Sequence, residues 1–385
     1  MADKTETVKG FKDFTGQEAG KRKKIISIIQ GVFERYGFEP AETPIIEREE
    51  FVRGDNENDE AVSDIFRLKD KGKRKLALRY EFTFQLKRIM KNMKLPYKRY
   101  QIGKVFRDEP VTSNRFRQFT QCDVDIIGSN ENDEAEVLST INDICEALGI
   151  NIEIYVNNRR LLNEILYENK VKKKDREEVI RIIDKLDKKP ENEVKRELKK
   201  YNADDILDVF KNKEQYFKKY ESYNELKRLK QYCKLYGFDI LFNPCLARGL
   251  SYYNGNVFEA RVKGSKDSIF GGGAFMFNNV QCFGYGCGLE RLSQIADIDI
   301  DNTEFLVLSV DEDKKAIEIA KKLRNKGKRT DLIINKRISK ALEYANSKQI
   351  EKVVFVGEKE VKKKKFKIKN MRTGKEKEVG EKDLV

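Results

Sequence analysis

The stretch FRDEPVTSNRFRQFTQCDVDIIG, which is Phe106 followed by Arg107 to Gly128, decides the fold. Its apolar start ends at Arg107, a polar loop covers Thr112 to Asn114, and a second run extends from Arg115 to Phe119. This order predicts two strands joined by a turn. On the returning strand one face carries Phe119, Gln121, Asp123 and Asp125, and the other carries Phe116, Gln118, Cys122 and Val124. One face is therefore polar where a core strand would be apolar.

Three arginines crowd this hairpin: Arg107, Arg115 and Arg117. They repel one another unless anions hold them, and a guanidinium group matches the geometry of a phosphate. The stretch therefore favours a polyphosphate site. The alternative is that the arginines pair with acids of the same hairpin, namely Asp108, Glu109, Asp123 and Asp125. These residues alone do not separate the two interpretations.

The composition describes a long, highly charged chain. Its 385 residues are enough for two or three domains, and 39% are hydrophobic while 37% are charged. No run of about 18 apolar residues suggests a membrane span, and the start MADKTETVKG lacks the apolar region of a signal peptide. We therefore expect a cytoplasmic protein. Six cysteines without a C-x-x-C pair are expected to be buried thiols, with no metal site.

Two features of the composition bear on chemistry. Histidine is absent, which excludes Ser-His-Asp triads, Cys-His nucleophiles and His-ligated metals. The net charge of +14 suggests a polyanionic partner. Residues 303–385 hold 24 lysines and arginines against 14 acids, a net charge of +10. This end of the chain is therefore the expected contact with a nucleic acid.

The region before the hairpin predicts a helix and two strands. Ile25, Ile28, Ile29, Val32, Phe33 and Tyr36 have helical spacing, and Gly37 is an expected stop. The proline-containing segment 38–46 reads as an edge strand. Residues 51–64 are acidic and are expected to form a loop. After them KLALRYEFTFQLKRI reads as a strand over Leu76–Arg79 that enters a helix.

The region after the hairpin alternates in character. A helix around Val137 and a strand over Ile152–Val156 are followed by residues 161–235, which are rich in Lys, Glu and Leu at helical spacing and interrupted by Pro190. We expect Gly271–Gly273 to form a turn that permits close backbone approach. Residues 303–385 predict strands at 305–310, 332–335, 353–356 and 366–368 with helices at 314–324 and 338–347. That order is typical of a separate α/β domain; its lysine run 362–365 could bind phosphate or guard a solvated strand edge.

Several motifs resemble those of class II aminoacyl-tRNA synthetases in their histidyl-tRNA synthetase form. The hairpin matches motif 2, which reads Phe-Arg-x-Glu, a loop, Arg-x-Arg-Glu/Gln-Phe, and then Gln with a downstream acid. LARGLSYYNGNVFE, over 246–259, is similar to the Arg-Gly-Leu-Asp-Tyr-Tyr-x-Gly-x-Val-Phe-Glu signature of histidyl enzymes. GYGCGLERL, from Gly284, resembles motif 3, and the segment 38–46 resembles motif 1, which forms the family's dimer interface.

The resemblance implies an α+β fold: a class II catalytic core on an antiparallel sheet, a helical insertion and a C-terminal α/β anticodon-binding domain. The implied domains are 1–160 and 236–300 for the two parts of the core, 161–235 for the insertion and 303–385 for the anticodon-binding domain. The implied reaction is the ATP-dependent ligation of histidine to tRNA(His) through a histidyl-adenylate. ATP, Mg²⁺ held mainly by phosphate oxygens, tRNA(His) and a second copy in a homodimer are the implied partners.

The resemblance also implies which residues hold ATP. Arg107 is placed at the α-phosphate, and Arg115 and Arg291 hold the outer phosphates. Glu109 reads the adenine amino group, and Phe119 stacks on the adenine ring.

The implied amino-acid site consists of Glu81, Thr83, Gln121, Asp125, Arg248, Tyr252 and Tyr253. Of these, Glu81, Thr83 and Gln121 take the α-ammonium group. Asp125 and Tyr253 take the imidazole, and Arg248 joins Arg107 as a catalytic residue at the α-phosphate. Without the resemblance, Glu81 would be expected to be an acid at a helix terminus, Arg248 an exposed arginine, and Tyr252 and Tyr253 core tyrosines.

Three positions depart from the family pattern. Tyr80 stands where many members have proline, Ser251 replaces an aspartate, and Ala274-Phe275-Met276 replaces Arg-Tyr-Asp. The last change puts one contact to the substrate ring in doubt. Two other classes of protein share parts of the pattern. One is a catalytically silent paralogue that regulates histidine biosynthesis, and the other is an RNA-binding module without catalysis.

Overall fold

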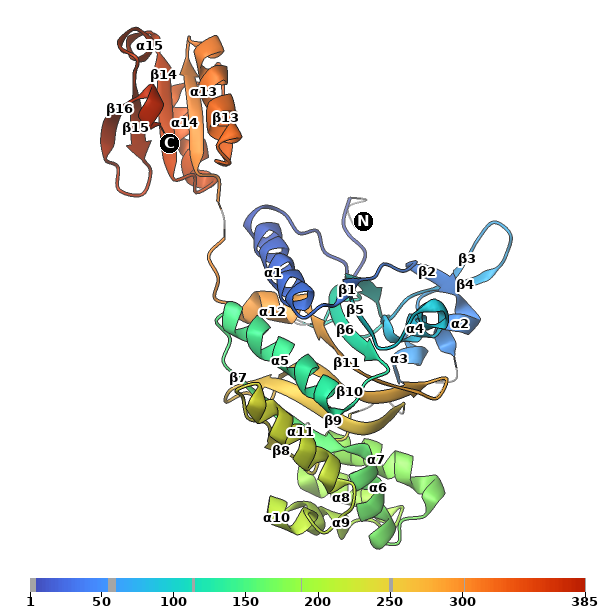
Figure 1. The fold of residues 1–385 in the computed structure, drawn as a ribbon. Helices are drawn as coiled ribbons and strands as arrows, with labels where there is room; N and C mark the ends of the chain where they lie inside the picture. The colour runs from blue at the N-terminus through green and yellow to red at the C-terminus, as the bar shows by residue number, and fades with distance from the viewer. Residues whose placement is uncertain are drawn as a thin grey trace. The chain divides into compact units, whose positions relative to one another are not determined.

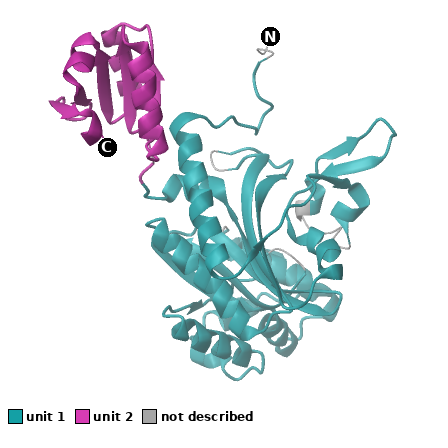
Figure 2. Ribbon diagram, turned by 45° about the horizontal axis from the view of Figure 1, so that its top comes forward, with its two compact units in different colours: residues 1–298 teal, residues 299–385 magenta. Residues whose placement is uncertain are grey.

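The structure, a computed structural model, describes residues 5–54, 60–112, 115–187, 189–248, 252–300 and 302–384. The chain divides into two compact units, residues 1–298 and residues 299–385 (Figure 2). Within the described ranges no helix has the length and apolar character that crossing a membrane would need.

The first unit begins with the predicted helix, α1 (Gly16–Arg35). Ile25, Ile29, Val32 and Phe33 are buried at helical spacing, and the chain turns at Gly37 with φ of 75°. Strand β1 (Glu39–Pro40) then pairs in parallel with β5 (Tyr97–Phe106). Within the described residues β1 pairs with one strand and lies at the edge of the sheet, so the edge strand predicted over 38–46 is present but limited to Glu39–Pro40.

A large, mostly antiparallel sheet forms the centre of the first unit (Figure 1). Its strand order is β1-β5-β6-β11-β10-β9-β7-β8. The other strands are β6 (Gln118–Ile127), β7 (Ile152–Asn158), β8 (Leu241–Phe242), β9 (Tyr253–Val262), β10 (Ser268–Phe277) and β11 (Val280–Gly288). The predicted hairpin is β5–β6, in register from Tyr97 opposite Ile127 to Phe106 opposite Gln118.

Helices cover one face of this sheet. Helix α1 packs with α5 (Glu131–Ala147) and α12 (Leu289–Ile295), and the buried core beneath them includes Cys122 and Val124 of β6. Aromatic rings connect strands on this face: Phe258 of β9 and Phe283 of β11 stack at 5.8 Å across β10, and Phe270 and Tyr285 of the adjacent strands β10 and β11 meet edge to face at 5.5 Å. The opposite face of β6 carries Gln121, Asp123 and Asp125, so the predicted division into two faces is confirmed.

The acidic segment 51–64 was expected to be a loop, and its described part is instead largely helical. It contains the end of α2 (Glu49–Arg53) and α3 (Glu60–Ser63), while residues 55–59 lie outside the described ranges. Acids favour the first turn of a helix, and Glu49 and Glu50 open α2. Val52 and Val62 supply buried apolar contacts that an acidic composition conceals.

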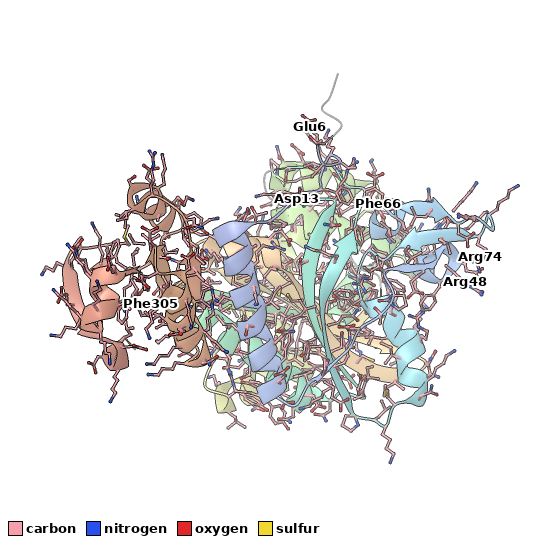
Figure 3. All side chains as sticks on the ribbon, turned by 90° about the horizontal axis from the view of Figure 1, so that it is seen from above. Glu6, Asp13, Arg48, Phe66, Arg74 and Phe305 are labelled. Atoms are coloured by element: carbon pink, nitrogen blue, oxygen red, sulfur yellow. The ribbon has the colours of Figure 1, made fainter. Side chains whose placement is uncertain are left out.

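A small sheet lies beside this segment, in the order β2-β4-β3. Its strands are β2 (Ile46–Arg48), β3 (Arg67–Lys69) and β4 (Lys75–Leu78), and Arg48 and Arg74 extend outward from it (Figure 3). As predicted, β4 leads into a helix, α4 (Thr83–Ile89), which is followed by the 3-10 helix η1 (Met90–Asn92).

The predicted helical insertion is present below the large sheet (Figure 1). Its described elements are α6 (Arg159–Glu168), η2 (Lys173–Asp175), α7 (Arg176–Ile183), η3 (Asp184–Asp187), α8 (Glu191–Lys199), α9 (Ile206–Phe210), α10 (Glu214–Phe217) and α11 (Tyr223–Leu235). Pro190 interrupts the helical pattern and stands directly before α8, where its missing N–H costs no helical hydrogen bond.

The prediction of a turn at Gly271–Gly273 is wrong, because these residues lie in the middle of strand β10. The need for close backbone approach is nevertheless real. A Cβ on Gly272 would lie 2.7 Å from the Cα of Tyr285, and one on Gly273 would lie 2.6 Å from the carbonyl oxygen of Asn256. The glycines therefore serve packing between neighbouring strands rather than a change of chain direction.

The second unit has its own sheet, in the order β13-β12-β14-β15-β16. Its described elements are β12 (Phe305–Val310), α13 (Asp313–Asn325), β13 (Thr330–Ile333), α14 (Ile338–Ser347), β14 (Lys352–Gly357), α15 (Glu358–Lys363), β15 (Lys365–Asn370), β16 (Glu376–Gly380) and the 3-10 helix η4 (Glu381–Asp383). The sequence pattern missed α15 and β16. The lysine run is not a strand edge, because it ends α15 and enters β15, which β16 covers.

Candidate functional site

A strip of the large sheet, on the face opposite the helices, has almost no side chains. Residues directly opposite each other on paired strands point to the same side of a sheet. One such row runs Gln101, Asp123, Gly286, Gly271 and Glu259, and the next runs Arg99, Asp125, Gly284, Gly273 and Val257. Each row has glycine on both β11 and β10. The strip is therefore a backbone floor over β11 and β10, with Asp123 and Asp125 on the β6 side and Glu259 on the β9 side.

Asp125, at the β6 side of this floor, forms a buried ion pair. Its Oδ2 lies 2.5 Å from Nη2 of Arg99, and the two side chains are 4% and 0% exposed. Burial raises the pKa of Asp125 to about 6, while Arg99 acts in the opposite direction. Gly284 opposite has to lack a side chain, since a Cβ there would lie 2.7 Å from Cγ of Asp125. Asp125 thus faces the floor, and its pKa of about 6 is close to neutral pH.

Asp123 is the neighbouring acid in the other row. Its Oδ2 accepts a hydrogen bond of 2.8 Å from Nε2 of Gln121, and its buried Oδ1 has no hydrogen-bond partner among the described residues. Burial raises the pKa of Asp123 well above its usual value, with Arg99 opposing and Asp125 adding to the shift. Sequence reasoning named Asp123 only as a possible partner of the hairpin arginines and assigned no role to Arg99. The cross-strand rows that bring them together depend on strand register, which the sequence does not show.

Two of the three hairpin arginines are loosely paired, and the third forms a close ion pair. Arg107 and Arg115 approach Glu109 at 3.8 and 3.7 Å, and Arg117 pairs with Asp108 at 3.0 Å. All three arginines thus pair with acids of the hairpin, as the alternative interpretation expected, but only with Asp108 and Glu109, because Asp123 and Asp125 have other partners. Residues 113–114 of the predicted polar loop lie outside the described ranges.

Arg107 is connected through Gln121 to the buried acid Asp123. Its Nε donates to the carbonyl of Tyr80 at 3.1 Å, and its Nη2 lies 3.4 Å from Oε1 of Gln121. Its guanidinium group also lies 5.1 Å from the centre of the Phe119 ring. The predicted nucleotide residues of the hairpin, with Glu109 beside them, are thus brought together at one end of β6.

Arg248 lies on the other side of the floor. It has φ of 57°, its Nη1 donates to Oε1 of Glu259 at 2.9 Å, and the other oxygen of Glu259 accepts from Arg261. Burial lowers the pKa of Arg248, but Tyr253 and Glu259 outweigh it and leave the pKa above its ordinary value. The following residues 249–251, including the departure at Ser251, lie outside the described ranges.

Glu81, Tyr252 and Tyr253 meet next to Arg248. Glu81 and Tyr253 are buried, and the rings of Tyr252 and Tyr253 are 4.8 Å apart. Burial, with Glu81 among the further causes, raises the pKa of both tyrosines. Thr83 is buried at the first position of α4, two residues after Glu81. The predicted amino-acid residues therefore converge, with the Arg99–Asp125 pair on the sheet beside them.

A cavity of about 220 Å³ opens beside this group, lined by residues that include Tyr80, Glu81, Phe84, Tyr252 and Phe277. Tyr80, one departure from the family pattern, forms part of its wall. Phe275, from another departure, is buried and packs edge-on against Tyr252 at 5.7 Å. An apolar ring thus occupies the position that bears a tyrosine in many members.

Arg291 stands apart from these contacts. It lies in α12, and its Nη1 donates to the carbonyl of Ser268 at 2.5 Å. Its neighbour Glu290, to which sequence reasoning gave no role, is buried and accepts from Arg22 at 2.8 Å and from the backbone N–H of Thr120. These contacts fix the start of α12 against α1 and β6.

No group of three or more cysteines, aspartates and glutamates within the described ranges is arranged to hold a metal ion. Glu259, the acid closest to Arg248, already has both oxygens bound to arginines. The described residues therefore do not form a protein-held metal site.

Comparison with known proteins supplies the family context. The chain matches the family described as Histidyl-tRNA synthetase over residues 10–292, and the anticodon binding domain over residues 304–385. Histidine--tRNA ligase 1 of Bacillus anthracis is 34% identical over 412 residues, with 96% of each chain covered. Histidine--tRNA ligase of Methanocaldococcus jannaschii is 32% identical over 405 residues, covering 97% of this chain and 96% of the relative.

Two solved structures extend the comparison. Histidyl-tRNA synthetase from Nostoc sp. PCC 7120 superposes with a TM-score of 0.84 at 26% identity, covering 98% of this chain and 97% of the other. A protein from Bacillus halodurans C, titled an ATP phosphoribosyltransferase regulatory subunit/histidyl-tRNA synthetase, has the same fold. Its TM-score is 0.78 at 18% identity, with 92% of this chain and 99% of that chain covered.

Proposed function

We propose, from the premise that this chain belongs to the histidyl-tRNA synthetase family, that it joins L-histidine to tRNA(His) at the expense of ATP. The observation that carries the proposal is the charge arrangement across the glycine floor. Asp125 lies on the β6 side, and Arg248 lies over β10. This arrangement fits a substrate with a cationic part at one end and a carboxylate directed at a phosphate at the other.

In the first step the histidine carboxylate attacks the α-phosphate of ATP, and pyrophosphate leaves. With no histidine in the chain, the protein contributes positioning and charge neutralisation. Arg107 and Arg248 neutralise the α-phosphate, and their positions on opposite sides of the floor suit a phosphate held between them. Nε and Nη2 of Arg107 contact Tyr80 and Gln121, and the 3.8 Å separation of Nη1 from Glu109 leaves Nη1 for such an anion.

The remaining nucleotide contacts are assigned by the family resemblance. Arg115 and Arg291 hold the outer phosphates, Glu109 reads the adenine amino group and Phe119 stacks on the ring. Arg115 is well placed because its side chain is 55% exposed and its ion pair with Glu109, at 3.7 Å, is long. For Arg291, the role requires its hydrogen bond to Ser268 to be exchanged for one to phosphate.

The amino-acid contacts follow the charges of the site. Glu81, Thr83 and Gln121 take the α-ammonium group. Asp125 and Tyr253 take the imidazole, a ring that can be neutral or cationic and pairs naturally with a carboxylate. Tyr252 packs against Tyr253 and closes that side of the site.

In the second step the terminal ribose hydroxyl of tRNA attacks the carbonyl of the adenylate, and AMP leaves. The domain at 303–385, with its net charge of +10, binds the anticodon arm, and the helices of 161–235 approach the acceptor arm. Mg²⁺ accompanies ATP and is held by phosphate oxygens and water, so no residue is assigned to it. We further propose that the protein is a cytoplasmic homodimer.

Histidine-dependent exchange of pyrophosphate into ATP tests the proposal. The fold alone does not separate a ligase from a silent paralogue, because the Bacillus halodurans structure covers 92% of this chain. A ligase incorporates labelled pyrophosphate only when histidine is present. A silent paralogue and an RNA-binding module both give no exchange. The absence of histidine-dependent exchange would therefore end the proposal.

A further inference from the structure

The Gln121 side chain lies between two charged groups. Its Nε2 donates to Oδ2 of Asp123 at 2.8 Å, and its Oε1 lies 3.4 Å from Nη2 of Arg107. If the amide were reversed, its oxygen would face the carboxylate and its N–H groups would face the guanidinium. Both contacts would then be repulsive. The two charged neighbours therefore select one orientation of the amide.

Among the described residues Gln121 supplies the side-chain hydrogen bond to Asp123, while Arg99 acts on Asp123 through its charge. Across the row, Gln101 donates instead to Oγ1 of Thr43 at 2.7 Å, and Gly286 has no side chain. Along the strand, Asp125 is paired with Arg99. Asp123 is 3% exposed, and burying such a carboxyl is costly unless it serves a partner. The partner that the structure provides is the Gln121 amide.

Gly286 preserves this contact. A Cβ built at this position would lie 2.7 Å from Oδ1 of Asp123 and 3.1 Å from Nε2 of Gln121. Any side chain there would displace both members of the hydrogen bond. The geometry thus protects the Asp123–Gln121 pair from the adjacent strand.

We propose that Asp123 is a positioning residue of the amino-acid site. Its Oδ2 holds the Gln121 amide so that Oε1 is presented as an acceptor to the α-ammonium group of the substrate. The inference rests on the proposed function, because it assigns Gln121 to that ammonium group. Asp123 acts as a hydrogen-bond acceptor in this role, and its negative charge is not what the substrate requires.

The test compares Asp123→Leu with Asp123→Asn in pyrophosphate exchange by the full-length protein. Leucine has a similar shape and no acceptor, so the KM for histidine should rise about 10- to 100-fold, the range for loss of a hydrogen bond to a charged group. Asparagine keeps one acceptor oxygen and should remain within about fivefold of the wild type. Equal losses in the two variants would show that charge matters, and would overturn the proposal.

A second measurement separates positioning from damage to the pocket. The competitive inhibitor 3-(imidazol-4-yl)propionate has the ring and carboxylate of histidine but no ammonium group. Its inhibition constant and the KM for ATP should change less than about threefold in Asp123→Leu, since neither depends on the amide oxygen. A rise in the inhibition constant that matches the rise in the KM for histidine would overturn the proposal.

Gly286→Ala gives the same test if Asp123→Leu fails to fold. The added methyl group displaces the pair without changing either member, so it should raise the KM for histidine and spare the inhibitor. Glu134→Gln is the matched control, because Glu134 is another buried carboxyl that accepts a side-chain amide, Nδ2 of Asn256 at 2.7 Å. A raised KM for histidine in this control would remove the case for a specific role of Asp123.

The outcomes for the two proposals are distinguishable. A wild-type protein without histidine-dependent exchange contradicts the proposed function, whatever the variants do. A wild-type protein that exchanges normally, with Asp123→Leu at the wild-type KM, contradicts only the role of Asp123.

Discussion

The guanidinium group of Arg248 lies over Gly271 so closely that a Cβ on this glycine would be 2.6 Å from Cζ of Arg248. Arg248 comes from the segment that precedes β9, whereas Gly271 belongs to β10. The same row contains Glu259, which holds the arginine from the next strand at 2.9 Å. The position of Arg248 thus depends on the absence of a side chain 23 residues further along the chain.

Gly271→Ala should therefore impair catalysis without touching any substrate. The methyl group displaces the Arg248 guanidinium, which neutralises charge in the transition state, so kcat for exchange should fall about 10- to 100-fold. Gly31→Ala is the control, because Gly31 lies within α1 and a Cβ there would meet nothing within 4 Å. That change should leave exchange unaffected and slightly raise Tm. Wild-type kcat in Gly271→Ala would show that Arg248 adjusts freely.

Removing Arg248 itself should nearly abolish adenylate formation while the protein stays folded. Its charge matters chiefly in the transition state, so Arg248→Ala should lower kcat for exchange by about 100-fold or more. Arg248→Lys should restore only part of the rate, because lysine lacks the planar fork that reaches Glu259 and a phosphate together. Circular dichroism and Tm report the fold. A folded alanine variant that exchanges at the wild-type rate contradicts the assigned role.

A chain that ends at Ile298 should still activate histidine but charge tRNA poorly. The second unit has separate core clusters, one of which includes Phe305, Val354 and Phe366, and it holds none of the proposed adenylate-site residues. Exchange should persist, whereas the dependence of tRNA affinity on salt should flatten as fewer counterions are released. An unchanged salt slope would place the main RNA contact on the first unit.

Glu134 should make stability depend on pH. Burial raises its pKa to about 8, although the hydrogen bond from Asn256 acts in the opposite direction. Between the ordinary glutamate pKa of 4.5 and about 8 the native state holds a proton that the unfolded chain has released. The free energy of unfolding should therefore fall as pH rises through this window.

Glu134→Gln should remove that part of the pH dependence. At pH 6 the wild-type carboxyl is neutral, so the two proteins should have similar Tm values. At pH 9 the wild type has to bury a charge, so the variant should be the more stable. Thermal unfolding at both values checks this, and a variant that is less stable than the wild type at pH 9 would contradict the assignment.

Alternation and turn chemistry were enough to predict the β5–β6 hairpin and the two faces of β6. The helices α1 and α14 and the strand β12 followed from apolar spacing, because each buries one apolar stripe or run. The family motifs named Arg107, Arg248, Glu81 and Tyr253 as candidates, and the structure places them around one floor. Their chemical roles remain predictions.

The rest depended on contacts between distant segments. Arg99 and Asp123 became candidates only because register aligns them with Asp125 and Gly286. The glycines of β10 looked like a turn, since a strand interior normally contains side chains that pack. Helix α15 was missed because its sequence, Glu358–Lys363, has no apolar stripe. Helix α2 was missed because its sequence is mostly charged and only one valine in it is buried.

The absence of side chains on the floor also affects what holds the strands of the sheet in register. Where β10 and β11 present glycine, no cross-strand side chains on that face resist a slip of one strand along the other. That resistance has to come from the helix-covered face, where Phe258 packs on Phe283 and Phe270 on Tyr285, whose hydroxyl lies 2.8 Å from Oγ1 of Thr140. A slip of one residue would carry these rings into the substrate's space. The aromatic side chains on the helix-covered face thus fix the strand register of the candidate site on the opposite face, although they do not contact that site.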